Sequence, residues 1–401
     1  MPQRWFLALA AACTLSAALS AVLVWFLMPK ASTDGARSDL QIVVRPDGGA
    51  SDQHGHIQAA INALPKARKV YATVALEGEF EIERGLRLDS YTLLDLRNAR
   101  LVLSGSANSS LVQNRAGKKG NHHIKVLGGF LRGNRRERGA EGSSCIQFDN
   151  TSHLHIDGIR VSECALDGIT VNGHGQHPQH HSLVDLVANN NFRDGLSVTW
   201  AVRRASIADI SANWNNRHGV YSDHSESSYR NIRAEFNGGD GIYIRNVFNN
   251  VYYGLWARKN GRHGIAVRGM VESTGSEWLT ANNGFIEKMA PGADLFFSGD
   301  ATLSYGITAR SAITGIFAGA SQRSTRGQAA YALWIEPAGD GQPVYPGLTL
   351  SHMVTDGDVL VPTDAGLRSD TWLSQCGTAG VSNAGAAMLT CVSSSSPDAG
   401  E

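Results

Sequence analysis

Asp240-Gly241-Ile242 is one of five closely similar phrases in this chain, and the interval between the phrases decides the fold. The other four are Asp167-Gly168-Ile169, Asp194-Gly195-Leu196, His218-Gly219-Val220 and His263-Gly264-Ile265. Successive phrases are 27, 24, 22 and 23 residues apart. A period in the twenties is typical of a small structural unit that stacks on copies of itself. The sequence therefore predicts a repeat architecture.

The columns of residues around each phrase show what the repeating unit is. We call the Asp or His that opens each phrase the anchor. The columns eight and six residues before it, and two and four residues after it, hold mainly Ile, Leu, Val and Ala. This alternation predicts short strands that cannot bury an apolar face alone but can do so when stacked. We therefore predict an all-β, parallel β-solenoid.

Two polar columns carry more specific expectations. The column three residues before the anchor reads Cys164, Asn191, Asn215, Asn237 and Asn260. Asn side chains at equivalent turns can stack and form hydrogen bonds along the axis, so we expect an asparagine ladder. The glycine that follows each anchor is expected to occupy a backbone position with positive φ.

The pattern resembles the right-handed parallel β-helix superfamily, which includes pectate lyases, polygalacturonases, phage tailspikes and alginate-modifying enzymes. The resemblance covers roughly residues 40–330, and residues 56–65 resemble the amphipathic helix that caps the first coil in that superfamily. We therefore expect a linker and first strand at 31–52 and a capped β-helix at 53–330. The repeat is lost after residue 330, so we expect an irregular β C-terminal cap at 331–392, and the low-complexity residues 393–401 predict a disordered tail.

The N-terminal segment favours a position outside the cytoplasm. Residues 5–28 contain no charge and are long enough to span a bilayer. No good cleavage site follows, so we predict a retained transmembrane anchor at residues 1–30, with cleavage of a signal peptide as the alternative. The solenoid would then lie in a bacterial periplasm or at the cell surface. In that compartment a disulfide between Cys376 and Cys391 is expected, whereas Cys145 and Cys164 are expected to be buried packing residues.

The charge balance excludes one class of partner. Lys plus Arg and Asp plus Glu are equal at 36 each, so no basic excess favours nucleic acid. We expect a monomer that needs no cofactor.

Residues three and five positions after each anchor should point outward if those at two and four point inward. The resulting strip is polar, aromatic and charged, as a groove for an extended polysaccharide requires. Its first column is Thr170, Ser197, Tyr221, Tyr243 and Ala266, and its second is Asn172, Thr199, Asp223, Arg245 and Arg268, with Trp200 and His224 expected at its edge. From this strip we predict substrate contacts by Asn172, Thr199, Trp200, Arg245 and Arg268.

The strip also suggests a reaction. Asp223 or His224 could remove the C5 proton of a uronate, while Arg245 and Arg268 neutralise the sugar carboxylate. Tyr221 or Tyr243 could donate a proton. This chemistry would give β-elimination or C5 epimerisation. The alternative is an interstrand ion pair between Asp223 and Arg245 on a solvated face.

The phrase Tyr221-Ser222-Asp223-His224-Ser225 is similar to the Asp-Pro-His motif of mannuronan C5-epimerases, which are also β-helices. In that family one Pro separates the Asp from the His, whereas Asp223 and His224 are adjacent. The resemblance carries a role to Asp223 and His224 alone.

Residues 173–181 form an insertion with four histidines. They could hold a metal, but Gly and Pro leave their geometry unfixed, so we predict no metal site. His174 and His177 are instead predicted to flank the groove and contact substrate. Three alternatives remain: a non-catalytic polysaccharide-binding or export protein, a glycoside hydrolase that uses Glu226 or an acid not yet identified, and an adhesin-like solenoid.

Overall fold

The computed structural model describes residues 40–105, 107–138 and 142–281, and beyond them the backbone of separate strands up to residue 391. Residues 41–401 form one compact unit. The predicted anchor at 1–30 and the predicted tail at 393–401 lie outside the described residues. Within the described part of the chain, no helix combines the length and apolar character that crossing a membrane requires.

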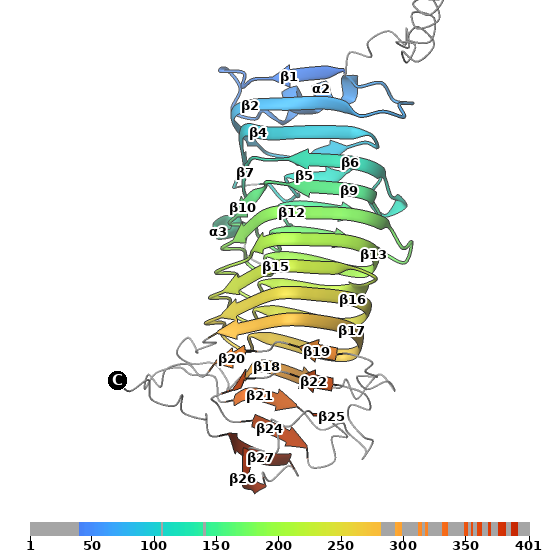
Figure 1. Cartoon of the computed structure of the whole chain (residues 1–401). Coiled ribbons are helices and arrows are strands. Elements are labelled where there is room, and N and C mark those ends of the chain that lie inside the picture. The colour runs from blue at the N-terminus through green and yellow to red at the C-terminus, as the bar shows by residue number, and fades with distance from the viewer. Residues whose placement is uncertain are drawn as a thin grey trace, which may run out of the picture. The chain divides into compact units, whose positions relative to one another are not determined.

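The strands stack in parallel as coils of a β-solenoid (Figure 1), and their pairings define three faces. The first face contains β3 (Leu86–Leu88), β5 (Val112–Asn114), β8 (Ile146–Asp149), β11 (Ile169–Asn172), the start of β13 (Leu196–Ser211), β14 (Val220–Ser225), and the starts of β16 (Ile242–Arg258) and β17 (Ile265–Ala281). It continues through β18 (Ala293–Ser298), β21 (Tyr331–Ile335) and β24 (Val359–Pro362).

The second face follows the first around the coil. It contains β1 (Gln41–Val44), the starts of β2 (Ala72–Ile82) and β4 (Thr92–Leu103), β6 (His122–Leu127), β9 (Ser152–Asp157), the start of β12 (Gln179–Asn189), the start of β15 (Ser228–Glu235) and the middle parts of β13, β16 and β17. Strands β19 (Ala312–Thr314), β22 (Thr349–Ser351) and β25 (Arg368–Ser369) extend it.

The third face completes the coil. It contains the ends of β2, β4, β12, β13, β15, β16 and β17, together with β7 (Phe130–Arg132), β10 (Arg160–Ser162), β20 (Phe317–Gly319) and β23 (Val354–Thr355). Two short helical elements, η1 (Gly117–Lys119) and α3 (Arg135–Arg138), interrupt the early coils.

The predicted inward columns form the core. Residues two and four positions after each anchor are at most 1% exposed, and this set is Ile169, Val171, Leu196, Val198, Val220, Ser222, Ile242, Ile244, Ile265 and Val267. Equivalent residues of successive strands are register partners, as in the pairs Ile169–Leu196 and Val220–Ile242. The predicted parallel solenoid and its inward register are confirmed.

Helix α2 (His54–Ala63) covers the first coil, as the sequence predicted. Its buried residues are Ile57 and Ile61, which are four positions apart and therefore share one face of the helix. The helix contacts β1, β2 and β3. It shields apolar side chains at the open end of the stack, where an uncovered solenoid would expose its core.

The glycines after the anchors are required for a different reason from the predicted one. Their φ angles lie outside the left-handed region. A Cβ atom on Gly168 would lie 2.6 Å from the carbonyl oxygen of Gly195, and one on Gly241 would lie 2.6 Å from that of Gly264. The expectation of positive φ is therefore wrong, and close approach between coils excludes a side chain.

The predicted asparagine ladder is present and buried. Asn191 Nδ2 donates to Asn215 Oδ1 at 2.9 Å, Asn215 Nδ2 donates to Asn237 Oδ1 at 3.0 Å, and the same contact follows at Asn260. Each Nδ2 of Asn215, Asn237 and Asn260 also donates to a backbone carbonyl at 3.0 Å. The ladder thus provides partners for polar groups that the turn removes from water.

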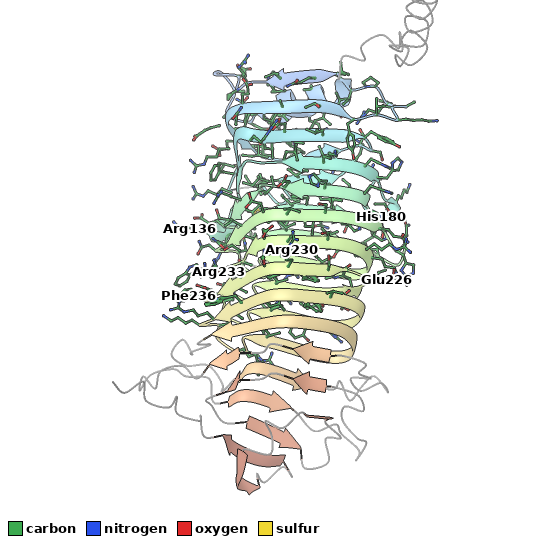
Figure 2. The ribbon with its side chains drawn as sticks, in the orientation of Figure 1. Arg136, His180, Glu226, Arg230, Arg233 and Phe236 are labelled. Atoms are coloured by element: carbon green, nitrogen blue, oxygen red, sulfur yellow. A yellow bond between two sulfur atoms is a disulfide. The ribbon has the colours of Figure 1, made fainter. Side chains whose placement is uncertain are left out.

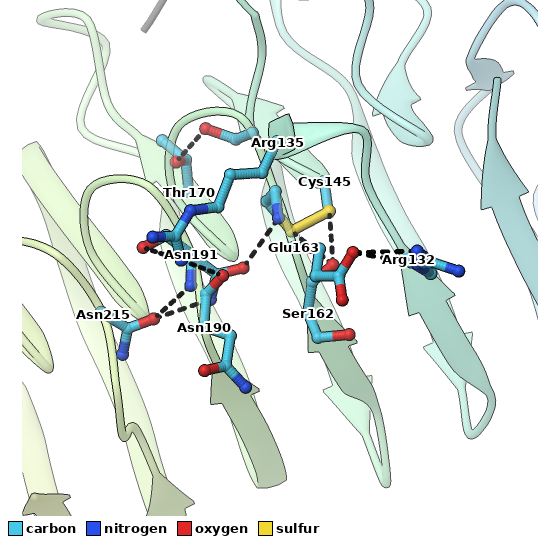
Figure 3. Close-up of a disulfide and its surroundings, with 11 residues drawn as sticks. Arg132, Arg135, Cys145, Ser162, Glu163, Thr170, Asn190, Asn191 and Asn215 are labelled. Atoms are coloured by element: carbon cyan, nitrogen blue, oxygen red, sulfur yellow. Dashed lines mark hydrogen bonds and ion pairs between the residues drawn. A yellow bond between two sulfur atoms is a disulfide. The ribbon is translucent and has the colours of Figure 1, made fainter. Parts of the chain in front are cut away.

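Cys145 and Cys164 form a disulfide, with Cα atoms 5.3 Å apart, so the expectation of separate packing residues is wrong (Figure 3). The physical reason lies in the adjacency of two columns. Gly168 follows the anchor of its coil and lies against Asn191 of the asparagine ladder. One coil earlier, Cys145 takes the position of Gly168 and Cys164 takes the position of Asn191. The two cysteine side chains therefore meet.

Removal of this disulfide should lower stability measurably. The bond joins residues 19 positions apart, and a closed loop of that length is worth about 3 kcal/mol. We expect the variant with both Cys145→Ser and Cys164→Ser to unfold at a lower urea midpoint, as should the reduced wild-type protein. A reductant should shift the midpoint of the variant less than that of the wild type, because only the bond expected between Cys376 and Cys391 is then left to reduce. An unchanged wild-type midpoint after reduction would contradict the assignment.

The C-terminal strands end in an antiparallel pair, β26 (Cys376–Val381) and β27 (Ala386–Cys391), in which Cys376 is the register partner of Cys391. Their side chains are outside the description, so the disulfide expected there stays a prediction.

Candidate functional site

Asp223 and Tyr221 lie together on the outward side of the first face. Both belong to β14 and are separated by one inward residue, Ser222, so they point the same way. The Tyr221 hydroxyl donates a hydrogen bond of 3.4 Å to Asp223 Oδ2. Burial raises the pKa of Asp223 to about 6, against the opposing effects of Arg245 and the Tyr221 hydroxyl. The same burial, with Asp223 as the next cause, raises the pKa of Tyr221 to about 12.

This arrangement gives the pair distinct chemical tendencies. A carboxyl group with a pKa near 6 is ionised at neutral pH but binds a proton more readily than an ordinary aspartate does. A phenol with a pKa near 12 keeps its proton over the whole physiological range. Asp223 is thus suited to accept a proton, and Tyr221 to donate one.

Aromatic rings extend the site along the solenoid axis. The Tyr221 and Tyr243 rings stack with centroids 5.2 Å apart, and Tyr243 stacks on the His218 ring at 4.7 Å. The guanidinium of Arg217 lies 5.4 Å from the Tyr221 ring centroid. These contacts hold the tyrosines in fixed orientations beside Asp223.

Arg245 belongs to the strand next to Asp223. Its neighbour Ile244 is the register partner of Ser222 in β14, which places Arg245 beside Asp223 along the stack. Arg268 is the register partner of Arg245 in β17, but its side chain is outside the description. The backbone therefore places the two predicted arginines on adjacent coils.

His224 is not at the edge of this site. It is 2% exposed, and its ring lies inside the solenoid, 3.3 Å from the Tyr229 hydroxyl. Burial lowers its pKa to about 3. Because β14 continues to Ser225, the alternation of side chains continues too and turns His224 inward. The predicted position of His224 at the groove is therefore wrong, and its ring cannot reach a substrate on the first face.

A second polar cluster lies on the same face, on β8, β11 and the insertion. His174 Nε2 is 2.9 Å from Asp149 Oδ1, and Asn172 Nδ2 donates to the same oxygen at 3.0 Å. Gln147 Nε2 donates to Asp149 Oδ2 at 3.0 Å. Thr199 Oγ1 donates to Asn172 Oδ1. Two predicted residues, Asn172 and His174, thus contact the Asp149 carboxylate, which the sequence pattern did not mark, and Thr199 joins them through Asn172.

Asp149 could have been found by extending the second outward column one coil towards the N-terminus. It lies five residues after Ser144, where the anchor pattern is weaker but still present. The structure pairs Asn172 with Asp149 in register, and Asn172 with Thr199 in the following coil.

Two further predicted residues of the site are His177 and Trp200. His177 is exposed in the insertion, with a φ of 49°. Trp200 belongs to β13, at a register irregularity between Thr199 and Arg203, and its side chain is outside the description. Among the described residues, no three His, Cys, Asp or Glu side chains are grouped as a metal site would need.

Two other carboxylates of the coils form hydrogen-bonded ion pairs with arginine side chains. Arg193 Nε donates to Asp167 Oδ1 at 2.7 Å, and Arg217 Nε donates to Asp194 Oδ1 at 2.7 Å. The hydrogen bond to Asp167 is the main cause that raises the pKa of Arg193. These anchors are fully buried and structural.

Glu226 lies at the edge between the first and second faces, on the same side of the stack as His180 (Figure 2), and within 3.5 Å of Arg203 and Arg204. Asp149 is three strands from Asp223, about 14 Å at the usual strand spacing. A pair of glycosidase carboxyl groups is about 5–9.5 Å apart. Asp149 and Asp223 therefore do not form such a pair.

Comparison with known proteins identifies the fold. No family model matches the chain, and no curated protein matches it. The A-module of mannuronan C-5 epimerase AlgE4 from Azotobacter vinelandii superposes with a TM-score of 0.52 and 17% identity, covering 77% of this chain and 92% of that one. The enzymatically active domain of tailspike protein 2 of bacteriophage CBA120 gives 0.61 and 13%, covering 83% of this chain and 52% of that one.

The catalytic domain of a GH87 alpha-1,3-glucanase gives a TM-score of 0.51 and 12% identity, covering 82% of this chain and 68% of that one. At these identities the likeness concerns the fold alone. The chain has the right-handed parallel β-helix fold that its repeat resembles.

Proposed function

We propose that this protein acts on a uronate-containing polysaccharide by removing the proton at C5 of a sugar, with β-elimination as the favoured outcome. The observation that carries the proposal is the pairing of Asp223, whose pKa is about 6, with the Tyr221 hydroxyl beside Arg245 on a rigid outward face. The polysaccharide class is further supported by structural neighbours that include a mannuronan epimerase module and an alpha-1,3-glucanase domain.

In this mechanism the Asp223 carboxylate removes the C5 proton, and the electrons of the C–H bond form the C4–C5 double bond. The bond from C4 to the glycosidic oxygen breaks, and the Tyr221 hydroxyl protonates that oxygen. Arg245 binds the uronate carboxylate and stabilises the negative charge that develops on it. Asp223 then returns its proton to Tyr221 across their 3.4 Å contact, which restores both groups.

The position of the two groups favours elimination over epimerisation. Asp223 and Tyr221 rise from one strand on one face, so both reach the substrate from the same side. Elimination can use a base and an acid on one side of the ring when C5–H and C4–O lie on that side. Epimerisation needs a proton donor on the opposite side. C5 epimerisation is the second candidate, supported by the AlgE4 neighbour, of which this chain covers 92%.

The other classes gain less support. Hydrolysis would need a second carboxyl group near Asp223, and Glu226 is engaged by Arg203 and Arg204. A polysaccharide-binding or export role would use the same face without the reaction. An adhesin-like role gains no specific support from these contacts.

We further propose that the protein is a monomer held at the membrane by residues 1–30, with the solenoid in the periplasm or at the cell surface. The Cys145–Cys164 disulfide supports an oxidising compartment. The uncharged run at residues 5–28 supports an anchor.

Incubation of the full chain in detergent with alginate and with polygalacturonate tests the proposal. Elimination produces an unsaturated sugar that absorbs in the ultraviolet. Epimerisation exchanges C5 protons with deuterated water without cleaving the chain. Reducing ends without ultraviolet absorbance would indicate hydrolysis, and binding without either signal would favour the export role. Either of the last two outcomes overturns the proposal.

The pH profile should report Asp223. Because the base acts in its ionised form, kcat/KM should rise about tenfold per pH unit below pH 6 and level off above it. Tyr221 keeps its proton through this range. The profile should also be recorded for His174→Gln, because His174 contacts Asp149 on the same face. If the rise in kcat/KM below pH 6 disappears in that variant, its assignment to Asp223 is wrong.

A further inference from the structure

A cleft lies on the third face, away from Asp223. It has a volume of about 470 Å³ and lies over the ends of β4 and β12 and over β7 and β10. We call it the arginine cleft, and its main lining side chains are Arg100, Phe130, Arg132, Arg160, Asn189 and Asn190. Neither the candidate reaction nor the fold gives this cleft a role.

The register explains how the cleft forms. Arg100 of β4 is the partner of Phe130 in β7, which is the partner of Arg160 in β10. One outward column therefore places Phe130 between Arg100 and Arg160. The strands that carry them are about 4.8 Å apart. The Arg160 guanidinium lies 5.9 Å from the Phe130 ring centroid.

The charge in the cleft is positive. Its lining residues include three arginines and no Asp or Glu. Arg132 forms an ion pair with Glu163 at 3.1 Å (Figure 3), and Arg100 forms one with Glu79 at 3.4 Å. Both pairs are partly exposed, and such pairs contribute little and exchange readily with a competing carboxylate. Arginine is well suited to a planar carboxylate because its donors match two oxygens at once.

The aromatic ring adds a second recognition element. Phe130 is 58% exposed, although a packing role would bury it. An exposed ring flanked by cations suits the apolar face of a sugar that also carries a carboxylate. Asn189 and Asn190 provide amide groups that can donate to and accept from sugar hydroxyls.

We propose that the arginine cleft binds a uronate residue of an anionic polysaccharide and holds the polymer on the third face without reacting with it. The identity of the ligand rests on the proposed function, whereas the location of the site does not. The polymer would be held at two places on the solenoid, which favours long chains through the higher effective concentration of the second contact.

Retention of the full chain on gels that contain alginate or polygalacturonate tests the cleft, with neutral dextran gels as a reference. The double variant Arg100→Gln with Arg160→Gln should bind the acidic polymers roughly tenfold more weakly. Phe130→Ala, which leaves the net charge unchanged, should weaken retention by a smaller factor. The matched control is Arg230→Gln, since Arg230 lies on β15 of the second face (Figure 2) and is exposed.

The outcomes separate this inference from the proposed reaction. If no polymer is turned over but the double variant loses retention that Arg230→Gln keeps, binding in the arginine cleft is supported and the proposed reaction is contradicted. If turnover proceeds and the double variant binds long polymer as the control does, the reaction is supported and binding in the cleft is contradicted. Absence of wild-type retention on both acidic gels also overturns the cleft. For a turned-over polymer, the double variant should raise KM for long chains and leave kcat unchanged.

Discussion

Replacement of Asp223 by Asn is expected to reduce turnover of the acidic polysaccharide by about 10²–10⁴-fold, the usual contribution of a general base. The amide keeps the shape of the side chain and can still accept a hydrogen bond from Tyr221, but it cannot take a proton. Binding of the polymer should change little, because Arg245 and the aromatic rings remain. The measurement is kcat and KM on the polymer that gives the strongest ultraviolet signal.

Loss of structure should not explain that result. The folded state raises the pKa of Asp223 above its ordinary value, so folding favours the protonated form and the ionised form costs stability as the pH rises through about 6. A neutral Asn should therefore be at least as well tolerated at neutral pH. Asp185→Asn is the matched control, since Asp185 is exposed at a turn of β12 and has a left-handed φ of 50° that Asn also adopts.

The opposite result would assign the reaction to the cluster around Asp149. If Asp223→Asn keeps turnover within threefold while His174→Gln removes it, the reacting pair is His174 with Asp149, which are 2.9 Å apart. Both clusters lie on the first face. The proposed class of substrate would therefore stay the same, and only the residue assigned as the base would change.

Replacement of Asn215 by Ala should produce the largest loss of stability for a single change, about 3–5 kcal/mol. Asn215 is 1% exposed and accepts hydrogen bonds from the backbone and side-chain nitrogens of Asn191. It donates to Asn237 Oδ1 and to the Ala188 carbonyl. Alanine would leave these buried groups without partners, and each costs about 1–3 kcal/mol.

Urea denaturation followed by circular dichroism measures this effect. The control is Asn216→Ala, because Asn216 lies next to Asn215 but is exposed, and its side-chain oxygen accepts a hydrogen bond of 2.8 Å from Arg135. We expect the control to lose less than about 1 kcal/mol. A loss of similar size in both variants would show that the ladder does not contribute as a buried network.

The repeat made most of the fold predictable. Side chains alternate across a strand with a period of two, and only one register buries Ile169 and Val171 with their equivalents. The same alternation placed Tyr221 and Asp223 outward. It also assigns His224 to the interior, but that result needs the true end of β14, at Ser225, which the sequence pattern does not mark.

Contacts between coils were less predictable, because they depend on how columns from different coils meet. Cys145 and Cys164 occupy different columns of the repeat, and only the fold shows that these columns touch. A Cβ atom on Gly168, Gly195, Gly219 or Gly241 would lie 2.6 Å or 2.7 Å from a carbonyl oxygen of the next coil, and this contact, not the backbone angle, explains the glycine. Both features are distances across the stack, which a one-dimensional pattern does not contain.

The parallel solenoid, its inward columns, the asparagine ladder and the outward position of Asp223 could all be predicted from the sequence, because each follows from local periodicity and from the need to bury apolar side chains. The fold was needed to show that Asp149 joins His174, that burial raises the pKa of Asp223 to about 6, and that Arg100, Phe130 and Arg160 line one cleft. Those results depend on burial and on neighbours 20 or more residues away, which the stacking of the coils brings together.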